Sequence, residues 1–382
     1  MTKHQLRVQE VLHFFDNKDS VLGFRKMLDC AMDTQNMSIY KKAIELTDWK
    51  EKYPTYTDEL IEKSKILLQE IATIPVEEYN NEQSVLRARN ILKSYSSKKF
   101  SLGPVSVEIK KGQVYGLVGE NGNGKTTLLR ILAKEISYNE GELNYSFNQI
   151  PKNDYDLRTK LVYIPQRTAK WYGSLKDNLK FVLSNYGISS EENETRVLMM
   201  IARLGLWNYK HLKWSELSSG YKMRFELART LLRKPELLLL DEPLANLDVL
   251  AQQVILEDLK AIANSVNHPI ALILSSQQLY EVEKVSDKVI FLKNGQYKNN
   301  ENGLISDNQL IIEIDTSNSR EDLLETFKNF KLEKLNFNGG VFVAYFAEET
   351  ELYQVILALG NAKIQITYLR NISNSTRRFF VH

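Results

Sequence analysis

Apolar residues near the start of the chain recur at the spacing of amphipathic helices. Between Lys3 and about Thr73 they lie three and four positions apart, and turn-like breaks fall at 16–20 and 53–55. We predict a bundle of about four helices. It is either an appendage packed on its neighbour or a docking module for another subunit. The spacing is carried by Val8, Val11, Leu12, Phe15, Phe24, Met27, Leu28, Ala31, Ile61, Ile66, Leu67 and Ile71.

The pattern changes to strands beyond an acidic and polar linker at 75–84. Short apolar runs of strand length follow at 85–92, 103–109, 114–118, 237–240, 270–274 and 289–292. The four consecutive leucines at 237–240 are typical of a parallel strand buried on both faces. Helix-like stretches lie between the later runs. We therefore predict a doubly wound α/β sheet, which binds ligands at the carboxyl ends of its strands.

The last part of the chain has a third pattern. Its elements alternate as strand, helix, strand, strand, helix, strand, at 310–314, 319–329, 332–337, 341–346, 348–359 and 364–369. This order predicts a ferredoxin-like α+β domain. It contains no catalytic constellation, so we expect a regulatory or dimer-stabilising appendage. The tail at 374–382 either packs on a partner subunit or closes the domain.

Length and pattern together predict about two or three domains in the 382 residues. The expected boundaries are 1–74 for the helical bundle, 75–84 for the linker, 85–299 for the α/β domain and 300–382 for the C-terminal α+β domain.

Composition excludes several classes of protein. With 50 basic and 48 acidic residues the net charge is +2, which gives no global attraction to nucleic acid. A single cysteine, Cys30, rules out an internal disulfide and a cysteine-based metal cluster, and fits a reducing compartment. No apolar run is long enough to span a bilayer, and the start lacks the apolar core of a signal peptide. We expect a soluble chain whose membrane link, if any, is a partner.

A phosphate-binding loop follows the apolar run at 114–118. Gly119, Gly124, Lys125 and Thr126 match the pattern Gly-x-x-x-x-Gly-Lys-Thr between a strand and a helix. Glycines let several backbone N–H groups surround an anion, and Lys125 adds a full positive charge. Thr126 supplies a hydroxyl where a phosphate-bound magnesium ion would sit. The loop predicts a nucleoside triphosphate site.

Carboxylates and an amide end two of the predicted strands. Asp241 and Glu242 follow the leucine run, where burying them is costly unless a cation or hydrogen bonds meet them. We expect Asp241 to hold magnesium through water and Glu242 to accept a proton from an attacking water. Gln277 ends the run at 270–274.

Two further features are ambiguous by themselves. Ser218 and Gly220 open a helix, where a serine caps free N–H groups and the positive end of the helix dipole attracts anions. Taken alone, the segment is better explained as an ordinary N-cap. Tyr95 precedes the loop at a distance from which it could stack on an adenine ring, although core packing is the commoner role of an aromatic residue.

In this order and spacing the segments resemble the nucleotide-binding domain of ATP-binding cassette (ABC) proteins, over roughly residues 84–299. The phosphate loop looks like the family's Walker A motif, Asp241 and Glu242 its Walker B motif, and Gln166 its Q-loop glutamine. The segment 217–221, followed by Arg224 and Ala228-Arg229, resembles the family signature. The region of about 168–217 would be the helical subdomain that carries it, and the surface between this subdomain and the Q-loop receives a membrane subunit's helix in transporters.

The resemblance assigns roles to individual residues. It places ATP at Tyr95, Gly119, Asn121, Gly122, Gly124, Lys125, Thr126, Thr127, Ser218, Gly220 and Asp248. It places catalysis at Lys125, Gln166, Glu242 and Gln277. It places the magnesium ion at Thr126, Gln166 and Asp241.

The chain departs from the family pattern at two places. The signature is usually Leu-Ser-Gly-Gly-Gln, whereas Ser219 and Tyr221 stand at its third and fifth positions here. The family's switch histidine is replaced by Gln277, which cannot carry charge or relay a proton. We therefore expect slower hydrolysis than in a relative with histidine.

The resemblance implies a cytoplasmic ATPase subunit, peripheral on the membrane, that works with ATP and magnesium. Two such domains would face each other head to tail, as a homodimer rather than a heterodimer, and a separate permease would span the membrane. One alternative is a soluble family member that acts on ribosomes or nucleic acid. Another is a slowly hydrolysing partner in a heterodimer, suggested by Gln277. The transported substrate and its direction are left open.

Overall fold

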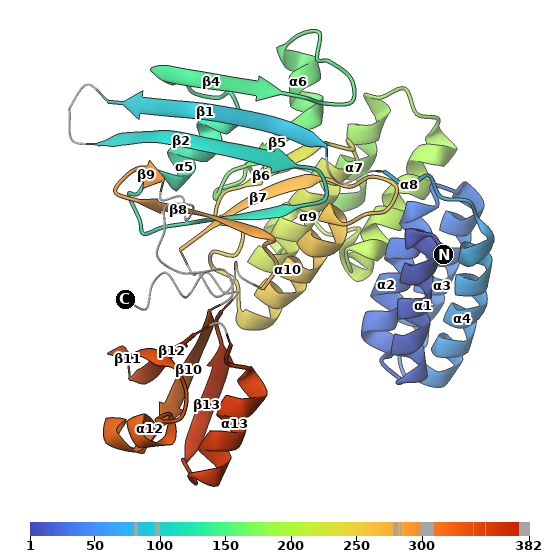
Figure 1. Cartoon of the computed structure of the whole chain (residues 1–382). Coiled ribbons are helices and arrows are strands. Elements are labelled where there is room, and N and C mark those ends of the chain that lie inside the picture. The colour runs from blue at the N-terminus through green and yellow to red at the C-terminus, as the bar shows by residue number, and fades with distance from the viewer. Residues whose placement is uncertain are drawn as a thin grey trace. The chain divides into compact units, whose positions relative to one another are not determined.

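The computed structural model describes residues 1–79, 83–95, 100–277, 282, 284–297, 309–338, 340–347 and 349–373. The chain divides into two compact units. One comprises Met1–Gln277 with Lys284–Tyr297, and the other comprises Gln278–Glu283 with Lys298–His382. The N-terminal helices thus belong to the same unit as the phosphate loop (Figure 1).

The N-terminal bundle consists of α1 (Lys3–Asp16), α2 (Ser20–Asp33), α3 (Met37–Lys52) and α4 (Thr57–Thr73), which confirms the predicted helices. Side-chain caps at Thr2, Asp19 and Asn36 satisfy backbone N–H groups at the starts of the first three helices. Ile66 is one of the residues that carry the helical spacing, but it does not face the core. It is 60% exposed, because the buried stripe of α4 runs through its neighbour Leu67.

Buried ion pairs fasten this bundle to the rest of its unit. Arg203, at the end of α8 (Ser190–Arg203), bonds to Asp29 on α2 at 2.7 Å and to Asp258 on α10 (Val249–Ala263) at 3.0 Å. Arg25 on α2 bonds to the same Asp258 oxygen at 2.9 Å. Burial alone would lower the pKa of Arg203, but the charges of Asp29 and Asp258 raise it. The bundle, α8 and α10 are therefore joined through one charged network.

A six-stranded sheet carries the site. Its order is β5 (Leu161–Ile164), β6 (Leu237–Leu240), β7 (Ala271–Ser276), β3 (Val114–Val118), β8 (Lys288–Lys293) and β9 (Gln296–Tyr297). Every pairing is parallel except that of β9, which is antiparallel. The ends of four adjacent strands therefore lie at one edge, and they lead into the segments that contain Gln166, Glu242, Gln277 and the phosphate loop.

A second, antiparallel sheet shares the hydrophobic core of the first. It contains β2 (Ser101–Lys110), β1 (Ser84–Ser94) and β4 (Glu140–Tyr145), and α5 (Lys125–Leu132) joins the same core (Figure 1). The sequence did not predict β4, because it is an edge strand with only Leu143 and Tyr145 packed against the core. Helix α5 begins at Lys125, so its first turn belongs to the phosphate loop.

The helices on the signature side are α6 (Asp154–Lys160), α7 (Leu175–Ser184), α8 and α9 (Ser219–Leu231), with short 3₁₀ turns at Trp207–Tyr209 and Trp214–Glu216. Of the aromatic residues in this region, Trp207 is buried, whereas Tyr172 and Phe181 are exposed. Throughout the described part of the chain, helices lack the length and apolar character needed to cross a membrane.

The second unit has the predicted ferredoxin-like topology. Its elements are β10 (Leu310–Thr316), α12 (Arg320–Thr326), β11 (Leu332–Asn338), β12 (Val341–Phe346), α13 (Leu352–Asn361) and β13 (Ile366–Asn371). The strands are antiparallel in the order β11-β12-β10-β13. The predicted helix at 319–329 ends early, because Phe327 leaves it to pack on Phe346 at a ring distance of 5.0 Å. The tail at 374–382 lies outside the described residues.

Candidate nucleotide-binding site

The phosphate loop joins β3 to α5 and depends on its glycines. Gly122 and Gly124 have φ values of +82° and +95°, which side chains with a Cβ rarely adopt. A Cβ on Gly119 would lie 2.5 Å from the carbonyl oxygen of Leu292. A hydrogen bond also fixes the loop. The backbone N–H of Asn294 donates to Oδ1 of the buried Asn123 at 3.1 Å. Sequence reasoning did not single out Asn123.

Lys125 lies inside this loop. Its Nζ donates to the carbonyl oxygen of Gly119 at 2.7 Å and to that of Glu120 at 3.3 Å, and the residue is 5% exposed. The same Nζ lies 3.6 Å from Oε1 of Glu242. A charged ammonium group is thus held by neutral carbonyl groups and one carboxylate, where it can exchange the carbonyl contacts for phosphate oxygens.

The other predicted catalytic residues lie around the carboxylate of Glu242. Its carboxylate accepts from Nε2 of Gln166 at 3.0 Å, and its two oxygens accept from Nε2 of Gln277 at 3.0 and 2.9 Å. Its φ of +47° is unusual for a residue with a side chain. The structure therefore brings Lys125, Gln166, Glu242 and Gln277 together from the ends of separate strands.

Two residues that sequence reasoning did not assign hold the acidic pair. Oγ of Ser275 donates to Oδ1 of Asp241 at 2.8 Å, and accepts from the backbone N–H of Glu242 at 2.8 Å. The hydroxyl of Tyr163 donates to the other Asp241 oxygen at 3.1 Å. Burial, and then the charge of Asp241, raise the pKa of Tyr163. The sequence signal that could have identified these two residues is the presence of a polar residue inside each of two buried strands.

The other predicted ATP ligands near the loop differ in their exposure to solvent. Asn121 and Thr126 are exposed and Thr127 is half-buried on the first turn of α5. Tyr95 is 42% exposed, and its ring centroid lies 6.5 Å from that of Phe100. An exposed aromatic face beside Phe100 is available for stacking.

The signature segment opens α9. Ser218 is exposed and caps the helix by accepting from the N–H of Tyr221 at 3.5 Å, and Ser219 donates to the carbonyl oxygen of Asn246 at 3.0 Å. Asp248 caps α10 through the N–H of Ala251 at 2.9 Å. Among the described residues, no hydrogen bond joins Ser218 or Gly220 to the phosphate loop of the same chain. Tyr221, in place of the usual glutamine, bonds to Tyr209 at 2.7 Å.

Comparisons with known proteins give the family. The ABC transporter family model matches residues 102–245. An uncharacterized ABC transporter ATP-binding protein of Methanocaldococcus jannaschii is 30% identical over 215 residues, 55% of this chain and 75% of that protein. The spermidine/putrescine import ATP-binding protein PotA of Mycoplasma mycoides is 33% identical over 218 residues, 56% of this chain and 60% of PotA. The chain belongs to the family of ABC transporter ATP-binding proteins, and it is an ATPase.

A solved structure supports the fold. CbiO1 from Clostridium perfringens, described as part of the ABC transporter complex CbiONQ, aligns with a TM-score of 0.52 and 24% identity. The alignment covers 57% of this chain and 88% of CbiO1. The α/β core is therefore that of an ABC ATPase.

The double role of Ser275 predicts the effect of its removal. In Ser275→Ala, Asp241 loses a buried donor and the N–H of Glu242 loses its acceptor, so the free energy of unfolding should fall by about 1–3 kcal/mol. The rate constant of ATP hydrolysis should fall more than the affinity for ATP. Denaturant unfolding and single-turnover kinetics measure both. Tyr163→Phe, which removes one bond to Asp241 only, is the matched control and should have the smaller effect; equal effects would contradict the assignment.

Proposed function

We propose that this chain is the ATPase subunit of a membrane transporter, peripheral on the cytoplasmic face, with the membrane-spanning permease supplied by another chain. The observation that supports the coupling is an aromatic groove between α6, α7 and α9. The chemistry is supported by the four side chains that meet at Glu242.

The site residues fit magnesium and the triphosphate of ATP. Thr126 offers a hydroxyl at the start of α5, Asp241 offers a carboxylate, and Gln166 offers an amide oxygen, which are the ligand types that magnesium prefers. The metal would neutralise charge that develops on the phosphate oxygens. Lys125 and the N-terminus of α5 would hold the β- and γ-phosphates.

In hydrolysis, Glu242 accepts a proton from the water that attacks the γ-phosphorus. The bond to the β,γ-bridging oxygen breaks, and ADP and inorganic phosphate leave. Donors from Gln166 and Gln277 orient the carboxylate of Glu242 for this role.

The second half of each site comes from another copy of the chain. In the described part of the chain, Ser218 and Gly220 form no hydrogen bond to their own phosphate loop, and an exposed serine at a helix start suits an anion. ATP would then join Lys125 of one protomer to Ser218 of its partner. To drive closure from 1:99 to 99:1, nucleotide contacts must supply about 5.5 kcal/mol of differential binding.

The aromatic groove fits a helix from a permease. It is a hollow of about 320 Å³ between α6, α7 and α9. Tyr155 and Phe181 line it with side chains that are 71% and 68% exposed. On its floor, the guanidinium of Arg229 lies 4.5 Å from the ring centre of Trp171, and Arg233 is close by. Arg229 is already paired with Glu226 at 2.7 Å, but Arg158 and Arg233 also line the groove. Exposed aromatic residues beside these two guanidinium groups would bind an apolar helix with acidic residues at one end.

The second unit offers a contact for a homodimer. Helix α13 exposes Tyr353, Ile356 and Leu357, and β13 stands at the edge of the sheet with Ile366 and Tyr368 exposed. An edge strand with apolar neighbours could add a weak contact once ATP has brought two copies together, since antiparallel edges are self-complementary.

The dimer can be tested with Glu242→Gln. This change removes the general base, so turnover should fall by about 10²–10⁴-fold while ATP still binds. Trapped ATP should then make the protein elute as a dimer on sizing columns. Lys125→Ala, which should lose nucleotide binding, is the control and should stay monomeric. A Glu242→Gln protein that remains monomeric with saturating ATP would contradict the proposal.

The role of Gln277 predicts opposite effects for two changes. Gln277→His should raise the single-turnover rate of hydrolysis, because histidine can carry charge and relay a proton. Gln277→Ala should lower it, because Glu242 loses a donor. The affinity for ATP should be unchanged in both. If Gln277→His leaves the rate unchanged with Glu242 present, slow hydrolysis is not due to this glutamine.

The groove can be tested by pull-down from detergent-solubilised membranes. The unaltered chain should retain a polytopic membrane protein, and Phe181→Asp should lose it while its ATPase rate in solution stays the same. Tyr56→Asp changes an aromatic residue of similar exposure on the N-terminal bundle and should retain the partner. Ribosomes or nucleic acid in place of a membrane protein would support the soluble alternative instead.

A further inference from the structure

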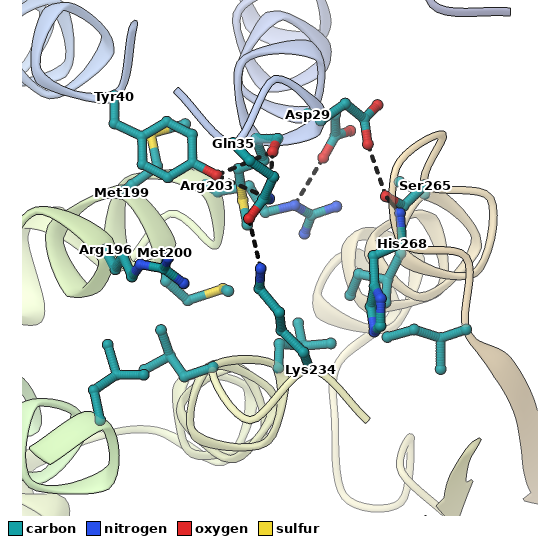
Figure 2. Close-up of a pocket in the computed structure, with 18 of the residues that line it drawn as sticks. Asp29, Gln35, Tyr40, Arg196, Met199, Met200, Arg203, Lys234, Ser265 and His268 are labelled. Carbon is teal, nitrogen blue, oxygen red and sulfur yellow. Dashed lines mark hydrogen bonds and ion pairs between the residues drawn. The ribbon is translucent and has the colours of Figure 1, made fainter. Parts of the chain in front are cut away.

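A cavity lies where the N-terminal bundle meets the rest of the first unit. Its volume is about 110 Å³, and it is formed by α2, α3, α8, α10 and the end of α9 (Figure 2). Much of its wall is apolar and flexible, and consists of Met32, Leu183, Met199, Met200, Leu231 and Ile262. Methionine-rich walls adapt to ligands of different shape.

The acidic groups at this cavity already have partners. Asp29 accepts from Arg203 at 2.7 Å. Asp33 accepts from Arg7 at 2.6 Å and from Ser265 at 2.7 Å. Glu192, on the turn before Arg196, accepts from it at 2.9 Å. The carboxylates therefore have little capacity to balance another cation.

Lys234 differs from the other cations at this cavity in its partner. Its Nζ donates to the neutral Oε1 of Gln35 at 2.7 Å, and within the described ranges no carboxylate lies at ion-pair distance from it. In Figure 2 it stands between Met200 and Arg196 on one side and His268 on the other. Burial, and then the charge of Arg196, lower the pKa of Lys234. Lys234 lines the cavity but is itself exposed, so an anion at this point would exchange its bond to the neutral Gln35 for a stronger charge-assisted one.

We propose that this cavity binds a small amphipathic monoanion, with its carboxylate on Lys234 beside Arg196 and a short apolar body among the methionine and leucine side chains. One carboxylate matches the one unbalanced ammonium group, because Glu192 already offsets the charge of Arg196. The cavity is somewhat smaller than the roughly 150 Å³ space that holds benzene, so the body is a short aliphatic chain or a small ring.

The position of the cavity links the ligand to the N-terminal bundle. Gln35 and Met32 belong to the bundle side, whereas Arg196 and Lys234 belong to the ATPase side. A ligand that bridges them stabilises the docked bundle by mass action. The site needs neither nucleotide nor permease, so it is independent of the transport proposal.

The test uses the full-length protein without nucleotide, with hexanoate as the probe in calorimetric titration and thermal unfolding. Hexanoate should bind saturably and raise the unfolding temperature, and acetate and hexylammonium should bind at least tenfold more weakly. Lys234→Gln, which keeps an amide near Gln35, should weaken hexanoate at least tenfold. Arg196→Gln should weaken it less. Lys260→Gln, an exposed lysine of α10, is the matched control and should bind normally.

Anion binding at the phosphate loop is the competing explanation. Lys125→Ala should therefore bind hexanoate as well as the unaltered chain, and ATP should not displace it. Equal hexanoate affinity in Lys234→Gln and the unaltered protein would overturn the proposal. So would displacement of hexanoate by ATP, or a preference for hexylammonium. None of these outcomes bears on ATP-driven dimer formation, so the two proposals fail separately.

Discussion

The carboxylate of Glu242 receives hydrogen bonds from Gln166 and Gln277 and lies 3.6 Å from the ammonium of Lys125. These side chains are far apart in sequence, and only a parallel sheet with this strand order brings them to one edge. The order β5-β6-β7-β3 places Glu242 between its donors. The sheet core, the glycines of the loop and the buried Ser275 all serve to hold that arrangement without a bound nucleotide.

Much of this arrangement was predictable from local patterns. The phosphate loop, the leucine strand with its acidic pair, and the six elements of the second unit all follow from spacing and turn residues. The roles of Ser275 and Tyr163 were not predictable, because the hydrogen-bond partner of a polar residue in a buried strand is known only once the pairing of the strands is known. Strand β4 was not predicted, because an edge strand buries few side chains and its sequence therefore has no apolar pattern. Ile66 shows that an apolar residue next to a core stripe need not belong to it.

The N-terminal bundle was left undecided between appendage and docking module. The structure shows that Arg203 and Arg25 join it to both α8 and α10 through Asp258. An assembly with buried ion pairs at its centre is specific, because removal of one partner leaves an uncompensated charge. Lys234 is the exception to this pairing, and it lies at the cavity between the same elements. The bundle therefore has both a rigid attachment and a place where a ligand can act on it.

The proposed dimer encloses each ATP between Lys125 of one protomer and Ser218 of its partner. The most direct measurement is the ATPase rate of an equimolar mixture of Lys125→Ala and Ser218→Asp chains. Aspartate preserves the cap of α9 but places negative charge against the phosphates. Each variant alone should be inactive, and the mixture should recover part of the normal rate, since a mixed dimer has one complete site. Hydrolysis by Ser218→Asp alone at the rate of the unaltered chain would contradict the account.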